Sequence, residues 1–200
     1  MTPLQTKTAF SLLQSPMMPA TLVQVAKSKG YHAVALTDEN VLYGMDNFYR
    51  EALQADLKPI LGLTVTVGGI YLKNQTFPII LLVQNQTGYH NLLKITSLIK
   101  TSENGELAFD QLLIYLTGLF LVFPEISEPQ LLMTTNNDQQ VTTILTSLQE
   151  TMPRENIFLG ITLEMTDLQL NTTMALADKL GSRIVAVDPI VYAEPQDYFA

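Results

Sequence analysis

Apolar residues recur along the chain in two alternating patterns, short continuous runs and longer stretches with helical spacing. Spacings of three and four residues, as at Val141, Ile144 and Leu148, are typical of helices that bury one face. The short runs, rich in β-branched residues, are typical of buried strands. Strands are expected over residues 4–8, 32–36, 59–67, 70–73, 78–83, 119–123, 157–162 and 183–187. Helices are expected over residues 19–29, 45–55, 88–100, 109–115, 138–150 and 167–180.

The order of these elements predicts an α/β fold with a mainly parallel sheet, either open or closed into a barrel. Strands alternate with helices through short connections, as in sheets whose strands are joined by crossover helices. An exception is expected at Gly68 and Gly69, a two-residue turn that favours a hairpin into residues 70–73. Residues 78–83 lack polar alternation, which predicts burial on both faces of that strand. Because no linker or repeat divides the sequence, residues 1–200 are expected to form a single domain.

The composition limits the chemistry that the chain can perform. Hydrophobic residues make up 47% of the chain and charged residues only 15%, against about 25% charged residues in typical soluble proteins. The formal net charge is −8, so we expect no nucleic acid binding by this chain alone, because phosphate backbones are bound mainly by Lys and Arg. Cysteine is absent and only His32 and His90 are present, which excludes disulfides, zinc-thiolate sites and histidine-rich metal sites.

The same features favour a cytoplasmic location. The first residues contain no basic region followed by an apolar run, so no signal peptide is expected. The most apolar stretch, Leu112–Phe123, is shorter than the roughly 18 residues that a membrane span needs. We therefore expect no membrane partner. The low content of charged residues favours an apolar face directed toward another domain.

Five segments, in this order and spacing, resemble a known family. They are FSLL at 10–13, AVALTDENVLYG at 33–44, LKPILG at 57–62, QTGYHNLLK at 86–94 and IVAVDPIVY at 184–192. Together they resemble the polymerase-and-histidinol-phosphatase (PHP) domain at the amino terminus of bacterial DNA polymerase III alpha subunits. The resemblance implies a distorted β/α barrel of about seven strands. It also implies that the chain is cut at its C-terminus from a longer polymerase.

The resemblance also locates a metal site whose ligands are lost. Where metal-binding members carry His-x-His, a histidine after Thr-Asp, a glutamate, a histidine, a cysteine and a final Asp-x-His, this chain has other residues. These vestigial positions are Gln5, Lys7, Glu39, Thr64, Pro78, Glu125, Pro189 and Val191. Asp38 is the clear match that remains. The resemblance therefore implies a degenerate site without a metal or other cofactor, and no catalytic residue.

The function that follows is a catalytically silent scaffold that supports the palm and thumb of the polymerase during DNA replication. The parent chain would be a DNA-directed DNA polymerase, a nucleotidyltransferase. Its partners would be the rest of the polymerase chain and, as in some family members, a proofreading exonuclease subunit. The alternative is a residual metal-dependent phosphoesterase or pyrophosphatase. It would use Asp38, Glu39, Glu125 and Asp188 as an all-oxygen ligand set for Mg²⁺ or Mn²⁺.

Three expectations concern Asp38 and the side chains around it. An aspartate after a strand most often accepts hydrogen bonds from nearby backbone amides, so Asp38 is expected to have a structural role. Glu39, taken by itself, is expected to be a solvated loop acid. If the two acids converge with Lys7, however, the lysine ammonium could replace the lost cation. That hypothesis predicts Lys7 within about 4 Å of one of the two carboxylates.

Overall fold

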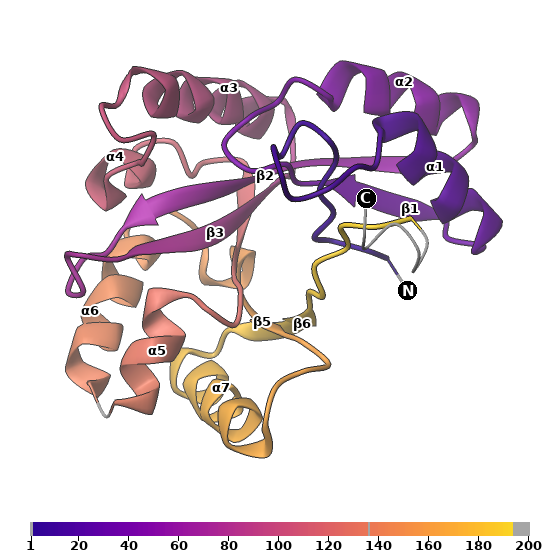
Figure 1. Ribbon diagram of the computed structural model, residues 1–200. Coiled ribbons are helices and arrows are strands. Elements are labelled where there is room, and N and C mark those ends of the chain that lie inside the picture. Colours follow the sequence, from indigo (N-terminus) through magenta and orange to yellow (C-terminus); the bar gives the residue numbers. More distant parts are fainter. Residues whose placement is uncertain (1, 136, 194–200) are drawn as a thin grey trace.

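Six strands form one curled sheet in which each strand lies beside its neighbours in sequence, from β1 to β6, within the part of the chain that is described (Figure 1). The computed structural model describes residues 2–135 and 137–193. The strands are β1 (Ala33–Leu36), β2 (Lys58–Gly68), β3 (Thr76–Val83), β4 (Leu119–Phe123), β5 (Ile157–Ile161) and β6 (Arg183–Ala186). The helices are α1 (Pro19–Ser28), α2 (Met45–Gln54), α3 (Gln86–Thr101), α4 (Phe109–Leu113), α5 (Glu128–Thr134), α6 (Asp138–Gln149) and α7 (Asp167–Leu180), with a 3₁₀ turn at Arg154–Asn156.

The sheet is mostly parallel, as the sequence predicts. Strand β1 pairs with β2, β4 with β5, and β5 with β6 in parallel, whereas β3 is antiparallel to both β2 and β4. Figure 1 shows α1, α2 and α3 along one side of the curled sheet and α5, α6 and α7 along the other. The expected α/β class with a distorted barrel is therefore confirmed.

The predicted strand at residues 4–8 is reduced to an isolated bridge between Thr6 and Ile190. Its backbone nevertheless bonds on both sides. The N–H of Thr37 donates to the carbonyl of Thr6 at 2.9 Å, and the N–H of Lys7 donates to the carbonyl of Ile190 at 3.0 Å. The amino-terminal segment thus links β1 to the chain that follows β6, at the two edges of the sheet. This link brings several vestigial positions to one end of the fold.

Strand β3 is buried on both faces, as its uninterrupted apolar run predicts. Ile79 and Leu81 join the large hydrophobic cluster between the sheet and its helices, while Ile80 and Leu82 join a separate cluster with Ala35 from β1. Because successive side chains of a strand point to opposite faces, an apolar residue is required at every position. Burial on both faces therefore does not require a parallel strand.

The predicted strand at residues 70–73 is wrong. The chain after β2 forms a loop, and the strand that completes the hairpin is β3. The reason is the buried carboxylate of Glu128, which accepts the backbone N–H groups of Ile70, Tyr71 and Leu72 at 2.8–2.9 Å. These amides are therefore not available to a strand ladder. Glu128 lies in α5, a short helix that the sequence analysis did not predict.

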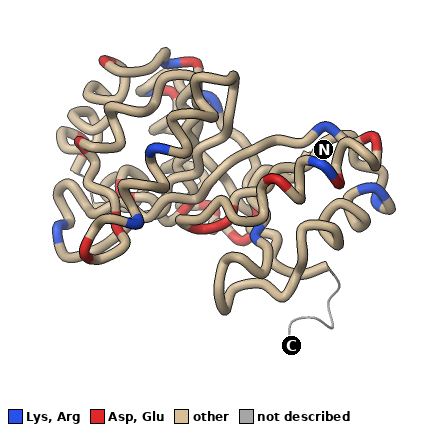
Figure 2. Tube along the Cα trace, turned by 90° about the horizontal axis from the view of Figure 1, so that it is seen from above, with Lys and Arg blue, Asp and Glu red and all other residues tan. Residues whose placement is uncertain are grey.

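Charged residues are sparse on this fold. Figure 2 shows acidic and basic residues interspersed along the trace, singly or in small groups. Within residues 2–135 and 137–193, no helix combines the length and hydrophobicity that a membrane span requires.

Candidate functional site

The first group of vestigial positions lies where β1 ends. Asp38 and Glu39 follow β1 after Thr37, and Glu39 forms a further parallel bridge with Thr64 of β2. The amino-terminal segment passes beside them, because the N–H of Thr37 donates to Thr6. In folds of this kind, the side chains at the carboxyl ends of parallel strands form the functional site. Here Lys7, Asp38, Glu39 and Thr64 lie together, just beyond the end of β1 and beside the middle of β2.

Asp38 has a structural role, but its partners are distant in sequence and are not the nearby backbone amides of the predicted turn or cap. It is 2% exposed, and its carboxylate accepts three hydrogen bonds. One comes from the backbone N–H of Thr8 at 2.6 Å, one from the Thr8 hydroxyl at 2.7 Å and one from the Ser11 hydroxyl at 2.7 Å. The Ser11 hydroxyl oxygen in turn accepts the N–H of Glu39 at 3.0 Å. The aspartate therefore holds residues 8–11 against the end of β1.

Lys7 lies against Glu39, and this contact confirms the predicted pairing. The Nζ atom of Lys7 is 2.8 Å from Oε2 of Glu39, and the two side chains are only 13% and 30% exposed. Gln14 completes the cluster, since its Nε2 donates to Glu39 at 2.8 Å and its Oε1 accepts from Lys7. The second oxygen of Glu39 accepts from the Thr66 hydroxyl at 3.3 Å. The simpler expectation that Glu39 is a solvated loop acid is therefore wrong.

The environment of Glu39 favours its charged form. Burial by itself raises the pKa of this carboxyl, but the hydrogen bonds from Lys7 and Gln14 and the charge of Lys7 oppose it, and Thr66 adds a smaller contribution. The net result is a pKa below the ordinary value for glutamate. The carboxylate and the ammonium thus form a neutralised pair in which the lysine supplies the positive charge.

Two further positions of this group, Gln5 and Thr64, are buried within the fold. The buried Thr64 hydroxyl donates to the carbonyl of Thr37 at 2.9 Å, so it is used within the sheet. Gln5 is 8% exposed, and its backbone carbonyl accepts from the N–H of Ile190 at 2.9 Å. Pro78 is half-buried in β3, directly opposite Thr66. It is the third residue of β3 and does not open the strand.

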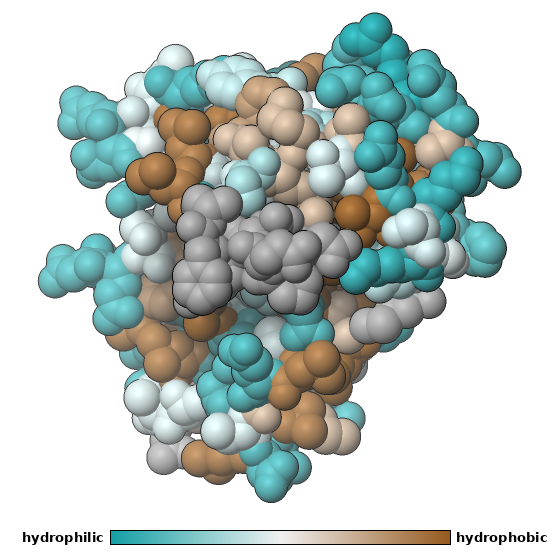
Figure 3. Space-filling view, turned by 45° about the vertical axis from the view of Figure 1, so that its right-hand side comes forward, coloured by the Kyte–Doolittle hydropathy of each residue, from teal (hydrophilic) through white to brown (hydrophobic). Residues whose placement is uncertain are grey.

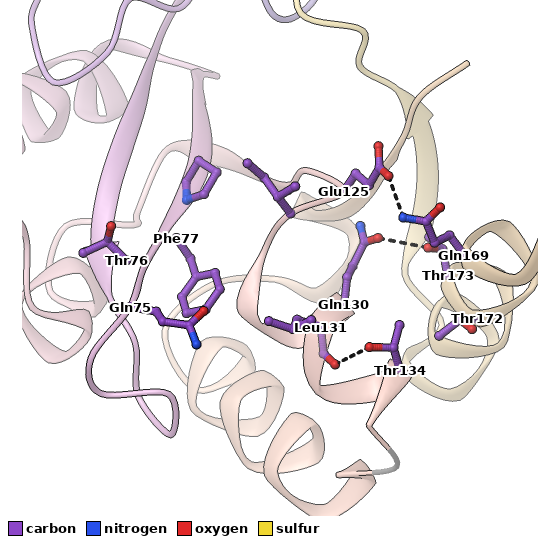
Figure 4. A pocket seen from close by; sticks show the side chains of 12 residues that line it. Gln75, Thr76, Phe77, Glu125, Gln130, Leu131, Thr134, Gln169, Thr172 and Thr173 are labelled. Atoms are coloured by element: carbon purple, nitrogen blue, oxygen red, sulfur yellow. Dashed lines mark hydrogen bonds between the residues drawn. The ribbon is translucent and has the colours of Figure 1, made fainter. Parts of the chain in front are cut away.

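A second group of vestigial positions lies beyond β4 and β6. Glu125 follows β4 and accepts from the Thr162 hydroxyl at 2.6 Å and from Nε2 of Gln169 at 2.8 Å. Glu125 and Pro78 line a cavity of about 360 Å³ between the start of β3, α5 and α7 (Figure 4). Asp188, which belongs to the alternative set of carboxylates, follows β6 and accepts the N–H of Leu163 at 2.8 Å.

The remaining two vestigial positions follow β6. Pro189 is exposed and Val191 half-buried. Neither side chain is a metal ligand type.

A metal cluster of the implied kind does not fit these residues. Hydrolytic two-metal sites need several carboxylates and imidazoles around ions about 3.5–4 Å apart. Among the residues described, no three His, Asp or Glu side chains are grouped so that they could hold a metal ion. Asp38 already accepts three donors, and the Lys7 ammonium lies against Glu39. The arrangement can hold loops and neutralise charge, and it offers no set of ligands for a cation.

Several polar residues of the site were not predicted from the sequence. Ser11 and Gln14 supply the bonds that join the amino-terminal loop to Asp38 and Glu39. Gln130, which is 5% exposed, donates to the carbonyls of Phe123 and Gly160 and accepts from Thr173. No local pattern marks these residues, because their partners are distant in sequence.

Comparison with known proteins identifies both a sequence family and a fold. The model of the PHP domain family matches residues 3–163. The DNA polymerase III alpha subunit of Bacillus subtilis is 36% identical over 121 residues, which are 60% of this chain and 11% of that protein. That of Staphylococcus epidermidis is 35% identical over 119 residues, 59% of this chain and 11% of that protein. The chain thus spans about a tenth of the length of these relatives.

Solved structures share the fold at low sequence identity. A candidate metal-dependent phosphoesterase from Bifidobacterium adolescentis superposes with a TM-score of 0.65 and 11% identity, covering 97% of this chain and 89% of that one. A two-domain protein from Bacteroides vulgatus with a predicted PHP-like metal-dependent phosphoesterase gives a TM-score of 0.64 and 11% identity, covering 98% of this chain and 53% of that one. At this identity the likeness concerns the fold alone.

Proposed function

The chain belongs to the PHP domain family, and we propose that it is a catalytically silent scaffold domain of a bacterial replicative DNA polymerase. The relatives named DNA polymerase III subunit alpha support the polymerase context. The proposed scaffold is a single domain, residues 1–200, of a longer cytoplasmic chain whose palm and thumb it supports. Its proposed partners are the remainder of that chain and other replisome subunits, such as a proofreading exonuclease, and it does not itself bind nucleic acid.

The observation that carries this proposal is the position of Lys7. In the family pattern this position belongs to the His-x-His of the metal site. Here its ammonium is 2.8 Å from the Glu39 carboxylate and mostly buried. A positive charge held at this position repels a metal cation, and it neutralises the partly buried carboxylate of Glu39. The former site therefore gains a stable internal pair that needs no ion.

A metal-binding measurement tests the proposal. The purified chain is incubated with Mn²⁺ and Zn²⁺, desalted, and its bound metal is measured by mass spectrometry. We expect much less than one equivalent and no hydrolysis of a phosphomonoester or of pyrophosphate. The matched control is the triple variant Gln5→His, Lys7→His and Glu39→His, which returns imidazoles to the family's ligand positions. A stoichiometric ion in the wild-type chain would refute the silent scaffold.

The alternative, a phosphoesterase or pyrophosphatase with four carboxylates, receives no support from the geometry. Asp38 and Glu39 each have donors of their own, and Glu125 and Asp188 are bonded to residues near β5 and α7. The same experiment decides this point. If metal binds, Asp38→Asn, which keeps the shape of the side chain, should weaken the binding strongly under the alternative, because Asp38 would be one of the four ligands.

A further inference from the structure

The loop formed by residues 8–18, here called the Leu12–Leu13 loop, exposes two consecutive leucines. Leu12 is 81% exposed and Leu13 106% exposed, and Met18 at the end of the loop is 48% exposed. Single exposed leucines are common on protein surfaces, but adjacent and fully exposed ones form an apolar projection. Figure 3 shows hydrophobic residues reaching the surface between hydrophilic ones on one face of the molecule. An apolar projection of this kind is suited to contact with a partner.

The polar residues of the degenerate site hold the Leu12–Leu13 loop in place. Thr8 and Ser11 are bonded to the buried Asp38, and Gln14 is bonded to Glu39 and Lys7. Two backbone bonds close the loop, from the N–H of residue 9 to the carbonyl of residue 17 at 2.8 Å and from residue 14 to residue 11 at 3.0 Å. The two leucines are therefore presented on a preorganised backbone, which lowers the entropy cost of binding.

The backbone of Leu13 is held in an unfavourable conformation. Its φ is 62°, in the left-handed region that costs a residue with a side chain about 1 kcal/mol or more. Such a conformation persists only where the surroundings impose it. The bonds of the flanking residues Ser11 and Gln14 provide that restraint. In this conformation the Leu13 side chain is fully exposed to solvent.

An aromatic pair extends the apolar surface beside the loop. The Phe10 ring packs edge to face against Tyr43, with centroids 6.4 Å apart, and Tyr43 is 62% exposed. Phe10 fits only because residue 44 is glycine, since a Cβ atom on Gly44 would lie 2.7 Å from the Phe10 ring. The Lys100 ammonium covers the Tyr43 ring at 4.3 Å. The surface thus continues from the two leucines toward α2 and α3.

The charge of this segment selects the kind of partner. Residues 8–26 contain no charged side chain, so the loop offers no cation to a phosphate backbone or an anionic membrane. An apolar pocket on a protein surface matches the chemistry of the Leu12–Leu13 loop. The relatives continue far beyond the matched region, which is about a tenth of their length. We propose that the Leu12–Leu13 loop docks into an apolar pocket on the polymerase part of the same polypeptide, an inference that rests on the proposed scaffold function.

Limited proteolysis of the full-length polymerase tests this docking. The double variant Leu12→Ser and Leu13→Ser should release the amino-terminal domain at least ten times faster than the wild type. The matched control replaces Leu163 and Leu168, which are 90% and 74% exposed outside the loop, and should behave as the wild type. In the 200-residue chain alone, the Leu12 and Leu13 substitutions should leave the melting temperature within about 2 °C, as expected for exposed side chains.

Each other outcome overturns the docking proposal in a recognisable way. Unchanged proteolysis of the full-length variant means that the loop docks nowhere on the polymerase. Destabilisation of the 200-residue chain itself means that the leucines pack internally. Loss of self-association, with the polymerase unaffected, assigns the surface to a second copy. The core variant Leu121→Ala, which disrupts the domain itself, separates the two proposals. If it destabilises the full-length polymerase while the Leu12 and Leu13 variant does not, the scaffold proposal stands and the docking proposal fails. If both variants are silent, the scaffold function fails as well.

Discussion

Replacing Asp38 by alanine removes the acceptor of three hydrogen bonds that hold residues 8–11 to the end of β1. Hydrogen bonds to a charged group contribute about 1.5–3 kcal/mol each, and a buried donor left without a partner costs about 1–3 kcal/mol. The hydroxyls of Thr8 and Ser11 can turn toward other acceptors, whereas the backbone N–H of Thr8 cannot. The three losses are therefore not additive. We expect a destabilisation of about 3–5 kcal/mol, a large share of the 5–15 kcal/mol typical of a domain.

Urea unfolding followed by far-ultraviolet circular dichroism measures this effect, because the chain has no tryptophan. Asp38→Asn keeps the shape and one acceptor oxygen, so its loss should fall between wild type and Asp38→Ala. Asp188→Ala is the matched control: among the described residues the half-buried Asp188 carboxylate accepts one hydrogen bond, from the N–H of Leu163, so its loss should cost about 1.5 kcal/mol or less. A loss below about 1 kcal/mol for Asp38→Ala would refute the structural role assigned to the aspartate.

Three further predictions concern the ion pair, a buried loop anchor and a close backbone approach. Because the pKa of Glu39 is lowered in the fold, its contribution to stability is present above the unfolded pKa and is lost as the pH falls through the folded pKa. Between pH 7 and pH 3, the wild type should lose more free energy of unfolding than Glu39→Gln or Lys7→Met. Equal losses in the three proteins, measured by urea unfolding at each pH, would contradict this. Glu128→Ala should destabilise the fold by about 2–4 kcal/mol, and faster hydrogen exchange at the three loop amides that it binds would identify the cause. Gly88→Ala should lower the melting temperature strongly, because its Cβ would lie 1.8 Å from the carbonyl oxygen of Gly118; an unchanged value would contradict that close approach.

Most elements could be predicted from the pattern of apolar residues. Strand β4 and helix α7 have the predicted bounds, and most other elements differ by one or two residues at an end. Such elements are encoded locally, because burial of one face fixes the period of the apolar positions. The short helix α5 was missed, although Pro129 near its first turn is a recognised start signal. Its seven residues are too few to establish a helical period.

The candidate site was predictable only in part. Comparison with the family pattern indicated that Lys7 replaces a ligand, and the charges of Lys7 and Glu39 suggested their pairing, which the 2.8 Å contact confirms. The roles of Ser11, Gln14 and Thr66 were not predicted, because each acts on a partner that the fold brings near. A hydroxyl or amide in a loop has many possible partners. Its sequence neighbours do not specify which one it meets.

The sequence by itself determined the class of fold and the order of its elements, because these depend on local periodicity, and it excluded thiolate chemistry, because the chain has no cysteine. Only the tertiary structure decided the antiparallel direction of β3 and the loop at residues 70–73. It also decided that the acids of the alternative ligand set each bond to partners of their own. These features depend on hydrogen bonds between distant segments, such as those of Glu128 and Asp38. A buried donor must find an acceptor wherever the fold provides one, and that choice is made by packing in three dimensions.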